Sequence, residues 1–121
     1  MTARALLLVD HGSREPEARA ALERLAAELR ARQPGRAVYL AHLELVPPSV
    51  AEAIATCAAD GVTDLVVHPF FLHPGRHAAV EVPQQVAAAA ARHPALRIRT
   101  TAPLGAAAGI ADLILATLPA D

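Results

Sequence analysis

Two histidine-bearing turns are the part of this sequence best suited to chemistry. They are residues 11–14 (His-Gly-Ser-Arg) and residues 73–77 (His-Pro-Gly-Arg-His), and each follows an apolar run that is typical of a buried strand. In an open α/β sheet, the residues just past the carboxyl ends of parallel strands converge on one crevice. We therefore expect the two turns to face the same pocket.

A carboxylate is expected at the same edge. Residues 37–43 predict a strand, and Glu44 comes at its carboxyl end, two residues after His42 and hence on the same strand face. Together, His11, His77 and Glu44 would form a mixed nitrogen and oxygen ligand set. Such a set suits a borderline divalent ion such as cobalt, iron, nickel or zinc, and it leaves coordination positions open. The pattern predicts an open metal site.

Each of these residues also has a plain structural interpretation when taken alone. Ser13 could cap a helix, Arg14 could be an exposed charge, and Glu44 could be a solvated strand end. Ordinary positions also exist for the other histidines, namely half-buried strand sites for His42 and His68, a loop surface for His73 and a helix end for His93. The coincidence of two histidine turns with one carboxylate favours a functional site.

The elements that must hold these turns alternate along the chain. Apolar runs predict strands at residues 5–9, 37–43, 65–67 and 96–100, and helical spacing predicts helices at residues 16–33, 50–60, 82–93 and 106–118. This alternation predicts an α/β fold, with a four-stranded, mostly parallel sheet and helices on both faces in three layers. Residues 70–81 would be the longest connection, and a long loop at a strand end is often functional.

Composition narrows the class of protein. The chain has 121 residues, of which 54% are hydrophobic, so we expect a single domain over residues 1–121. A net charge of −1 and 2% aromatic residues argue against a nucleic-acid partner. Cys57 is the one cysteine and fits a buried position in a reducing compartment. With no signal peptide or membrane span in the sequence, we expect a cytoplasmic protein without a membrane partner.

Four short motifs in a fixed order carry a resemblance that spans essentially the whole chain. They are residues 7–14 (Leu-Leu-Val-Asp-His-Gly-Ser-Arg), residues 43–49, residues 69–77 followed by Glu81-Val82-Pro83, and residues 101–105 (Thr-Ala-Pro-Leu-Gly). In order and spacing the chain resembles the small sirohydrochlorin chelatases of the CbiX/SirB type. One departure is mild, because Glu81-Val82-Pro83 stands where the family often has Asp-Ile-Pro.

The resemblance implies a class II chelatase fold and a lyase activity. Such an enzyme inserts a divalent metal, cobalt or ferrous iron, into sirohydrochlorin on the way to cobalamin or sirohaem. By position, His11 matches the family's first metal-binding and proton-accepting histidine, His77 its second metal ligand, and Glu44 the acid at the metal and the tetrapyrrole. The loop that lines the macrocycle corresponds to Leu72, His73, Pro74, Gly75 and Arg76.

The chemistry of the implied reaction suits these residue types. Metal insertion replaces two pyrrole protons, and histidine both binds metal and accepts a proton near neutral pH. The many carboxylates of sirohydrochlorin would find anchors in Ser13, Arg14 and Arg76. The metal, whether cobalt, iron or nickel, is a substrate, and no organic cofactor is required. Because this chain has one lobe where many chelatases have two, we predict a homodimer with a shared cleft.

Three other functions stay open from the sequence. A carrier of metal or tetrapyrrole would keep the same lobe without turnover. A nickel chelatase would differ in the metal alone. A histidine phosphatase has an Arg-His-Gly motif after its first strand, whereas Asp10 stands in the place of that arginine here.

Overall fold

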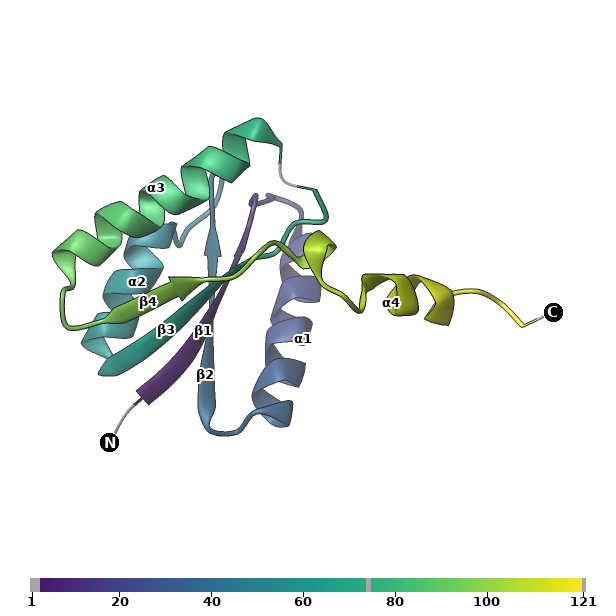
Figure 1. Cartoon of the computed structure of the whole chain (residues 1–121), viewed down its shortest axis with the longest axis horizontal. Helices are drawn as coiled ribbons and strands as arrows, with labels where there is room; N and C mark the ends of the chain where they lie inside the picture. The colour runs from purple at the N-terminus through teal and green to yellow at the C-terminus, as the bar shows by residue number, and fades with distance from the viewer. Residues whose placement is uncertain (1–2, 74, 121) are drawn as a thin grey trace.

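Four parallel strands form one sheet in the order β2-β1-β3-β4 (Figure 1). The computed structural model describes residues 3–73 and 75–120, with His77 described by its backbone alone. The strands are β1 (Ala3–Asp10), β2 (Arg36–His42), β3 (Val62–Pro69) and β4 (Arg97–Thr100). All three neighbouring pairs are parallel, so the expected α/β architecture is confirmed.

Helices cover both faces of the sheet, as predicted. On one face lies α1 (Pro16–Arg32), and on the other lie α2 (Val50–Ala59) and α3 (Arg76–Arg92) (Figure 1). A short 3-10 helix, η1 (Leu104–Ala106), follows β4, and α4 (Ile110–Ala116) projects from the body of the molecule (Figure 1). None of the helices within the described part of the chain is long and apolar enough to cross a membrane.

Local sequence explains where α1 and α2 begin. Pro16 occupies the first turn of α1, where the missing amide costs no hydrogen bond. Ser49 caps α2 through a capping box: its hydroxyl accepts a hydrogen bond from the Glu52 amide at 3.1 Å, and the Glu52 carboxylate accepts one from the Ser49 amide at 2.8 Å. These hydrogen bonds hold the pKa of Glu52 below its ordinary value.

The hydrophobic core divides into two clusters, one on each face of the sheet. The larger cluster lies under α2 and α3 and includes Leu7, Ile54 and Leu65, all of them fully buried. Cys57 belongs to this cluster, as expected, and burial raises the pKa of its thiol to about 12. The smaller cluster lies under α1 and consists of Leu8, Leu22, Ala26 and Val38, with partly buried residues around it.

The connection after β3 is shorter than we expected. Residues 70–81 were predicted as the longest loop, but α3 begins at Arg76, and the longer connection is residues 43–49 between β2 and α2. The predicted start of this helix at residue 82 is therefore wrong, and Pro83 lies inside α3. Burial on one helix face outweighs the hydrogen bond that this proline removes, since side chains at i, i+4 and i+8 (Ala78, Val82 and Val86) are all buried.

The end of the chain also differs from its prediction. A single helix over residues 106–118 is wrong, because η1 ends at Ala106 and α4 begins only at Ile110. Between them Ala107 is extended, with φ −67° and ψ 139°. Gly109 is the N-cap of α4. The apolar and alanine residues of this stretch are compatible with one continuous helix. In the structure, the extended Ala107 and the N-cap Gly109 divide the stretch into η1 and α4.

Candidate functional site

His11 stands exposed at the carboxyl end of β1. Its imidazole lies against the ring of Phe71, with 4.4 Å between the ring centroids and 49° between their planes. Phe71 follows β3 and is buried. Because β1 and β3 are neighbours in the sheet, their ends bring an accessible imidazole onto an apolar support. The segments that follow β1 and β3 therefore contact each other at one edge of the sheet.

Glu44 is tied to His11 through the backbone. Its amide donates a hydrogen bond of 3.1 Å to the His11 carbonyl oxygen, and the Leu43 amide donates one of 2.9 Å to the Asp10 carbonyl oxygen. The expectation that Glu44 shares a strand face with His42 is wrong, because β2 ends at His42 and Leu45 takes a left-handed φ of 74°. Glu44 is exposed, and its backbone is the part that contacts His11.

Gly12 makes this close approach possible. Its φ is +96°, in the left-handed region that favours glycine. A Cβ atom at Gly12 would lie 2.0 Å from the Glu44 carbonyl oxygen and 3.2 Å from the His42 Cβ. The glycine in the first histidine turn thus lets the end of β2 pack directly against the turn after β1.

A pair under this turn, a buried His42 and a partly exposed Asp10, was not predicted from the sequence. Asp10 and His42 face each other in the register of β1 and β2, and Asp10 Oδ1 lies 2.5 Å from His42 Nδ1. His42 is only 4% exposed, so the prediction of a half-buried strand position is wrong. A carboxylate at this distance orients the imidazole and satisfies its buried nitrogen. The sequence held both residues, but it could not reveal the strand register that joins them.

The segment after β3 contains most of the residues predicted to line a substrate. Leu72, His73, Gly75 and Arg76 are all exposed, and Leu72 is exposed by 72%. Gly75 is the N-cap of α3, so Arg76 and the His77 backbone lie in the first turn of that helix. Pro74 and the side chain of His77 lie outside the described residues.

The turn after β4 supports this segment. The Gly105 amide donates a hydrogen bond of 3.0 Å to the Phe71 carbonyl oxygen. A Cβ atom at Gly105 would lie 1.6 Å from the Leu72 carbonyl oxygen, so only glycine allows this contact. The motif at residues 101–105 therefore positions the segment after β3.

The first histidine turn leads into α1. The Ser13 hydroxyl accepts a hydrogen bond of 3.0 Å from the Glu15 amide, and Glu15 is the N-cap of α1. Ser13 thus shapes the turn just before the helix, close to the capping role considered for it. Arg14 is exposed.

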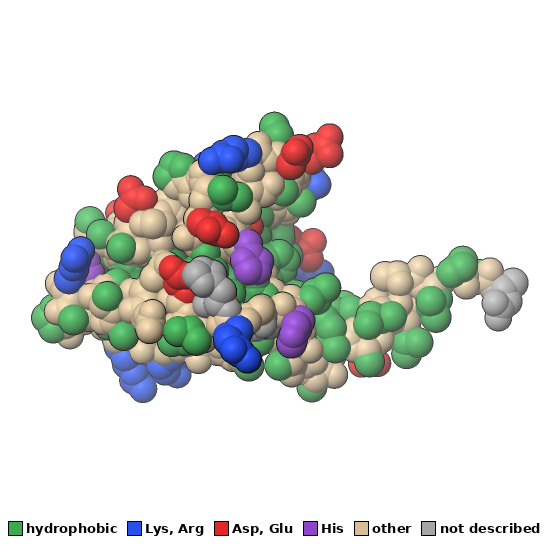
Figure 2. Space-filling view, turned by 90° about the horizontal axis from the view of Figure 1, so that it is seen from above, with side chains coloured by type: hydrophobic (Ala, Val, Ile, Leu, Met, Phe, Trp, Pro, Cys, Tyr) green, Lys and Arg blue, Asp and Glu red, His purple; other side chains and the backbone are tan. Residues whose placement is uncertain are grey.

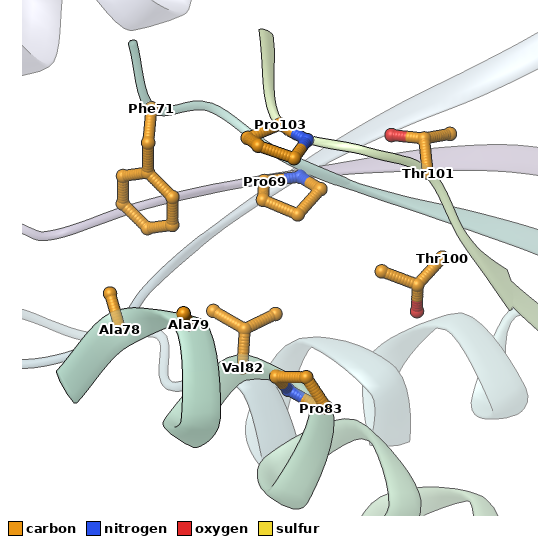
Figure 3. Close-up of a pocket in the computed structure, with 9 residues that line it drawn as sticks. All are labelled: Pro69, Phe71, Ala78, Ala79, Val82, Pro83, Thr100, Thr101 and Pro103. Carbon is orange, nitrogen blue, oxygen red and sulfur yellow. The ribbon is translucent and has the colours of Figure 1, made fainter. Parts of the chain in front are cut away.

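Two small cavities flank the strand ends. One of about 320 Å³ lies between His11, Gly12 and the start of α1. The other, of about 170 Å³, lies between the end of β3, the turn after β4 and the start of α3 (Figure 3). In Figure 3, Phe71 and Pro69 lie across this cavity from Ala78 and Val82. Pockets for drug-sized ligands hold roughly 300–1,000 Å³, so these two cavities lie at or below the lower end of that range.

The charged groups around the strand ends are mixed in sign. Figure 2 shows histidine side chains beside acidic and basic ones on the face seen from above. Among the side chains that the structure describes, no three His, Cys, Asp or Glu groups come together as a metal site. His77 is not among those side chains, so the predicted set of His11, His77 and Glu44 stays a prediction.

Two further titratable residues lie near the strand ends. His68 Nδ1 is 2.8 Å from the Thr101 hydroxyl oxygen, and burial lowers the pKa of His68 below its ordinary value of 6.5. Glu81 accepts a hydrogen bond of 3.3 Å from the Gln85 side-chain amide within α3. His68 therefore matches the half-buried strand position predicted for it.

Comparison with known proteins connects this arrangement to a family. The CbiX family model matches residues 5–119. The chain is 38% identical over 100 residues to the chloroplastic sirohydrochlorin ferrochelatase of Arabidopsis thaliana, covering 83% of this chain and 44% of that protein. The chain spans less than two thirds of the length of the curated relatives that it matches first.

Solved structures share the fold. A CbiX protein from Marinobacter aquaeolei VT8 superimposes with a TM-score of 0.79 and 27% identity, over 93% of this chain and 92% of that one. The sirohydrochlorin chelatase SirB of Bacillus subtilis subspecies spizizenii, in complex with cobalt, gives a TM-score of 0.82 and 27% identity, over 95% of this chain and 49% of that one. These matches offer no support for the histidine phosphatase alternative. The match over residues 5–119 shows that the chain belongs to the CbiX family.

Proposed function

We propose that this chain inserts a divalent metal ion, cobalt or ferrous iron, into sirohydrochlorin, as a lyase of cobalamin or sirohaem biosynthesis. The observation that carries the proposal is the exposed His11 imidazole, which lies on Phe71 at the strand ends, where the Glu44 amide is hydrogen-bonded to the His11 carbonyl oxygen. It occurs in a chain of the CbiX family, and relatives at 38% and 35% identity are named sirohydrochlorin ferrochelatase and cobaltochelatase.

In the proposed reaction, His11 holds the incoming metal ion, passes it to the ring nitrogens and then accepts one of the two pyrrole protons that the metal replaces. Glu44 accepts the other proton, and both protons pass to solvent. Imidazole suits both steps because it ligates divalent transition metals and titrates near neutral pH. Glu44 is the proposed carboxylate partner, since its backbone is bonded to His11 and its side chain is exposed. His77, in the first turn of α3, is the proposed second metal ligand. The metal is consumed as a substrate, and the reaction needs no organic cofactor.

The substrate is held by exposed residues around the same edge. Arg14 and Arg76 lie in the turns after β1 and β3, where guanidinium groups suit the peripheral carboxylates of sirohydrochlorin. The start of α3 offers free backbone amides to an anion. The proposed contacts to the ring itself come from Leu72, His73, Pro74 and Gly75, with Ser13 on the opposite turn.

A second copy of the chain supplies the other wall of the site in this proposal. The two cavities at the strand ends hold about 320 and 170 Å³, which is too little to enclose a tetrapyrrole. The curated relatives are longer, and this chain covers 44% of the Arabidopsis protein. A symmetric homodimer would place two such edges around one macrocycle. A cytoplasmic setting agrees with the single, buried Cys57 thiol.

The proposal is tested by an anaerobic insertion assay with purified protein and sirohydrochlorin. Cobalt, ferrous iron and nickel are supplied in separate reactions, and the absorbance change of the macrocycle is followed against a protein-free control. We expect insertion of cobalt or iron by the wild type. His11→Ala should lose at least about 100-fold in rate, the typical contribution of a general base.

The matched control is His93→Ala. His93 is the C-cap of α3, just before β4, and so lies away from the carboxyl ends of the strands. We expect this variant to keep wild-type activity. Full activity of both His11→Ala and His77→Ala would reject the site. A wild type that binds metal and sirohydrochlorin without turnover would instead support the carrier function, and preference for nickel would identify a nickel chelatase.

A further inference from the structure

The C-terminal helix α4 exposes an unusual number of aliphatic side chains. Leu113, Ile114 and Leu115 of α4, and Leu118 just after it, are each about 60% exposed (59–62%). Asp112 is the one charged residue between positions 110 and 120. Figure 2 shows the apolar side chains gathered along this projecting segment. A helix that is apolar on most of its surface is ordinarily buried against other elements. In this structure α4 is largely exposed, so most of its apolar side chains have no surface to pack against in the described part of the chain.

The α1 face of the sheet has a complementary gap. A groove of about 390 Å³ runs beside α1 and is lined by Leu6 and Leu8 of β1, Leu25 and Leu29 of α1, and Phe70 after β3. Parallel sheets are normally covered on both faces, and no second helix lies beside α1 on this face in the described part of the chain. His68, which also lines the groove, is hydrogen-bonded to Thr101. The groove is therefore an apolar surface without unpaired charge.

The groove lies next to the segment that leads into α4, but most of α4 does not pack in it. Leu104 and Leu113 reach the mouth of the groove. Beyond them, α4 points away from the sheet, and of the other described elements only η1 makes more than marginal contact with it (Figure 1). The extended Ala107 and the N-cap Gly109 form the link that directs the helix outward. Short links of this kind are where elements are exchanged between copies.

We propose that α4 of each copy docks in the groove beside α1 of a second copy, so that two chains exchange their C-terminal helices. Each copy then gives one helix and receives one, which closes the assembly at a dimer. The four exposed aliphatic side chains of each C-terminal segment, three in α4 and Leu118 after it, together with the groove surface that they cover, amount to on the order of 1,000 Å² for the reciprocal pair. This area reaches the lower limit of specific interfaces.

The exchange would also bring the partner close to the candidate site. Phe70 lines both this groove and the cavity beside His11. The partner's helix would thus pack on the wall of that cavity. The inference extends the homodimer proposed above, but it does not depend on chelatase activity, because oligomeric state is measured without any substrate.

Light scattering after size exclusion tests the proposal on the full chain. We expect the wild type to have twice the mass of one chain. Ile114→Asp should weaken the dimer at least about tenfold, because the new carboxylate would be buried in an apolar groove without a partner. Since Ile114 is exposed in the single copy, this variant should remain folded by circular dichroism. The matched control is Ala116→Asp, which adds the same charge four residues after Asp112 and should remain dimeric.

Disulfide trapping distinguishes exchange from docking within one chain. In a Cys57→Ala background, Leu25→Cys or Leu29→Cys is combined with Ile114→Cys, and the protein is oxidised. Exchange predicts covalent dimers. A monomeric wild type at the highest soluble concentration, a chain cross-linked only to itself, or a dimer in which neither cysteine pair reacts would each overturn the proposal.

Discussion

The two faces of the sheet differ in how completely they are covered. Under α2 and α3 lies the larger cluster, in which Leu7, Val9 and Leu65 have no exposed surface. Under α1 lies a cluster of four buried residues, a groove of about 390 Å³, and the partly exposed Leu6. The same strands supply both faces, so the difference comes from the helices: two pack on one face and one on the other.

The candidate site lies across both faces, because His11 packs on Phe71 of the larger cluster whereas the pair of Asp10 and His42 lies on the open face. Leu8 of β1 and Leu40 of β2 face α1. Asp10 and His42 come two residues later in the same strands, so they lie on the same face of the sheet. The cavity beside His11 is lined by the start of α1. The well-packed face therefore supplies most of the stability, whereas the open face keeps a surface available for a second copy. Each prediction below tests this division.

The largest effect should come from shortening neighbouring leucines on opposite faces. Leu7→Ala removes a fully buried side chain from the larger cluster and should lower the free energy of unfolding by about 2–5 kcal/mol. Leu6→Ala, on the groove side, should cost less than about 2 kcal/mol, because Leu6 is already partly exposed. Urea denaturation of both variants measures the difference. Equal losses would show that the α1 face is packed as tightly as the other.

An intermediate effect is expected at Gly12, at the end of the open face. Gly12→Ala combines a left-handed φ of +96° with a Cβ atom 2.0 Å from the Glu44 carbonyl oxygen, and should cost about 1–3 kcal/mol. The displaced end of β2 should also lower metal insertion by the folded variant. Unfolding in urea and the insertion assay are the two measurements.

Two other glycines act as controls for this prediction. Gly61 has a φ of +85° but open space around it, so Gly61→Ala measures the backbone strain alone. Gly35 has open space and no left-handed φ, and Gly35→Ala should be nearly neutral. If Gly12→Ala were no more costly than Gly61→Ala, the contact with Glu44 would not constrain the site.

The smallest effect concerns His68, which lines the groove. Burial lowers the pKa of His68 in the folded chain, so the unfolded chain binds more protons as the pH falls below about 6.5. Stability that is present above this pH should decline as the pH falls below about 6.5. Urea denaturation across this range should show a steeper decline for the wild type than for His68→Asn. Parallel curves would mean that His68 is as solvated when folded as when unfolded.

Much of the architecture was predictable because local patterns and burial agree along the chain. The continuous apolar run of β1 predicted a central strand, and Pro16 and Ser49 marked the starts of two helices. The start of α3 was not predictable, because Pro83 ordinarily begins a helix and here lies within one. Ala78 and Val82 are buried because α3 packs on the sheet, and that packing involves residues that are distant in the sequence.

For the candidate site, the sequence by itself determined which residues have suitable chemistry and which strand ends they follow. His11, Glu44 and the residues after β3 were identified in this way. Only the tertiary structure decided that Asp10 faces a buried His42, that Gly12 admits the Glu44 backbone, and that α4 leaves one face of the sheet uncovered. The physical reason is that strand register and helix docking are set by contacts between segments distant in sequence, whereas residue type and periodicity are local.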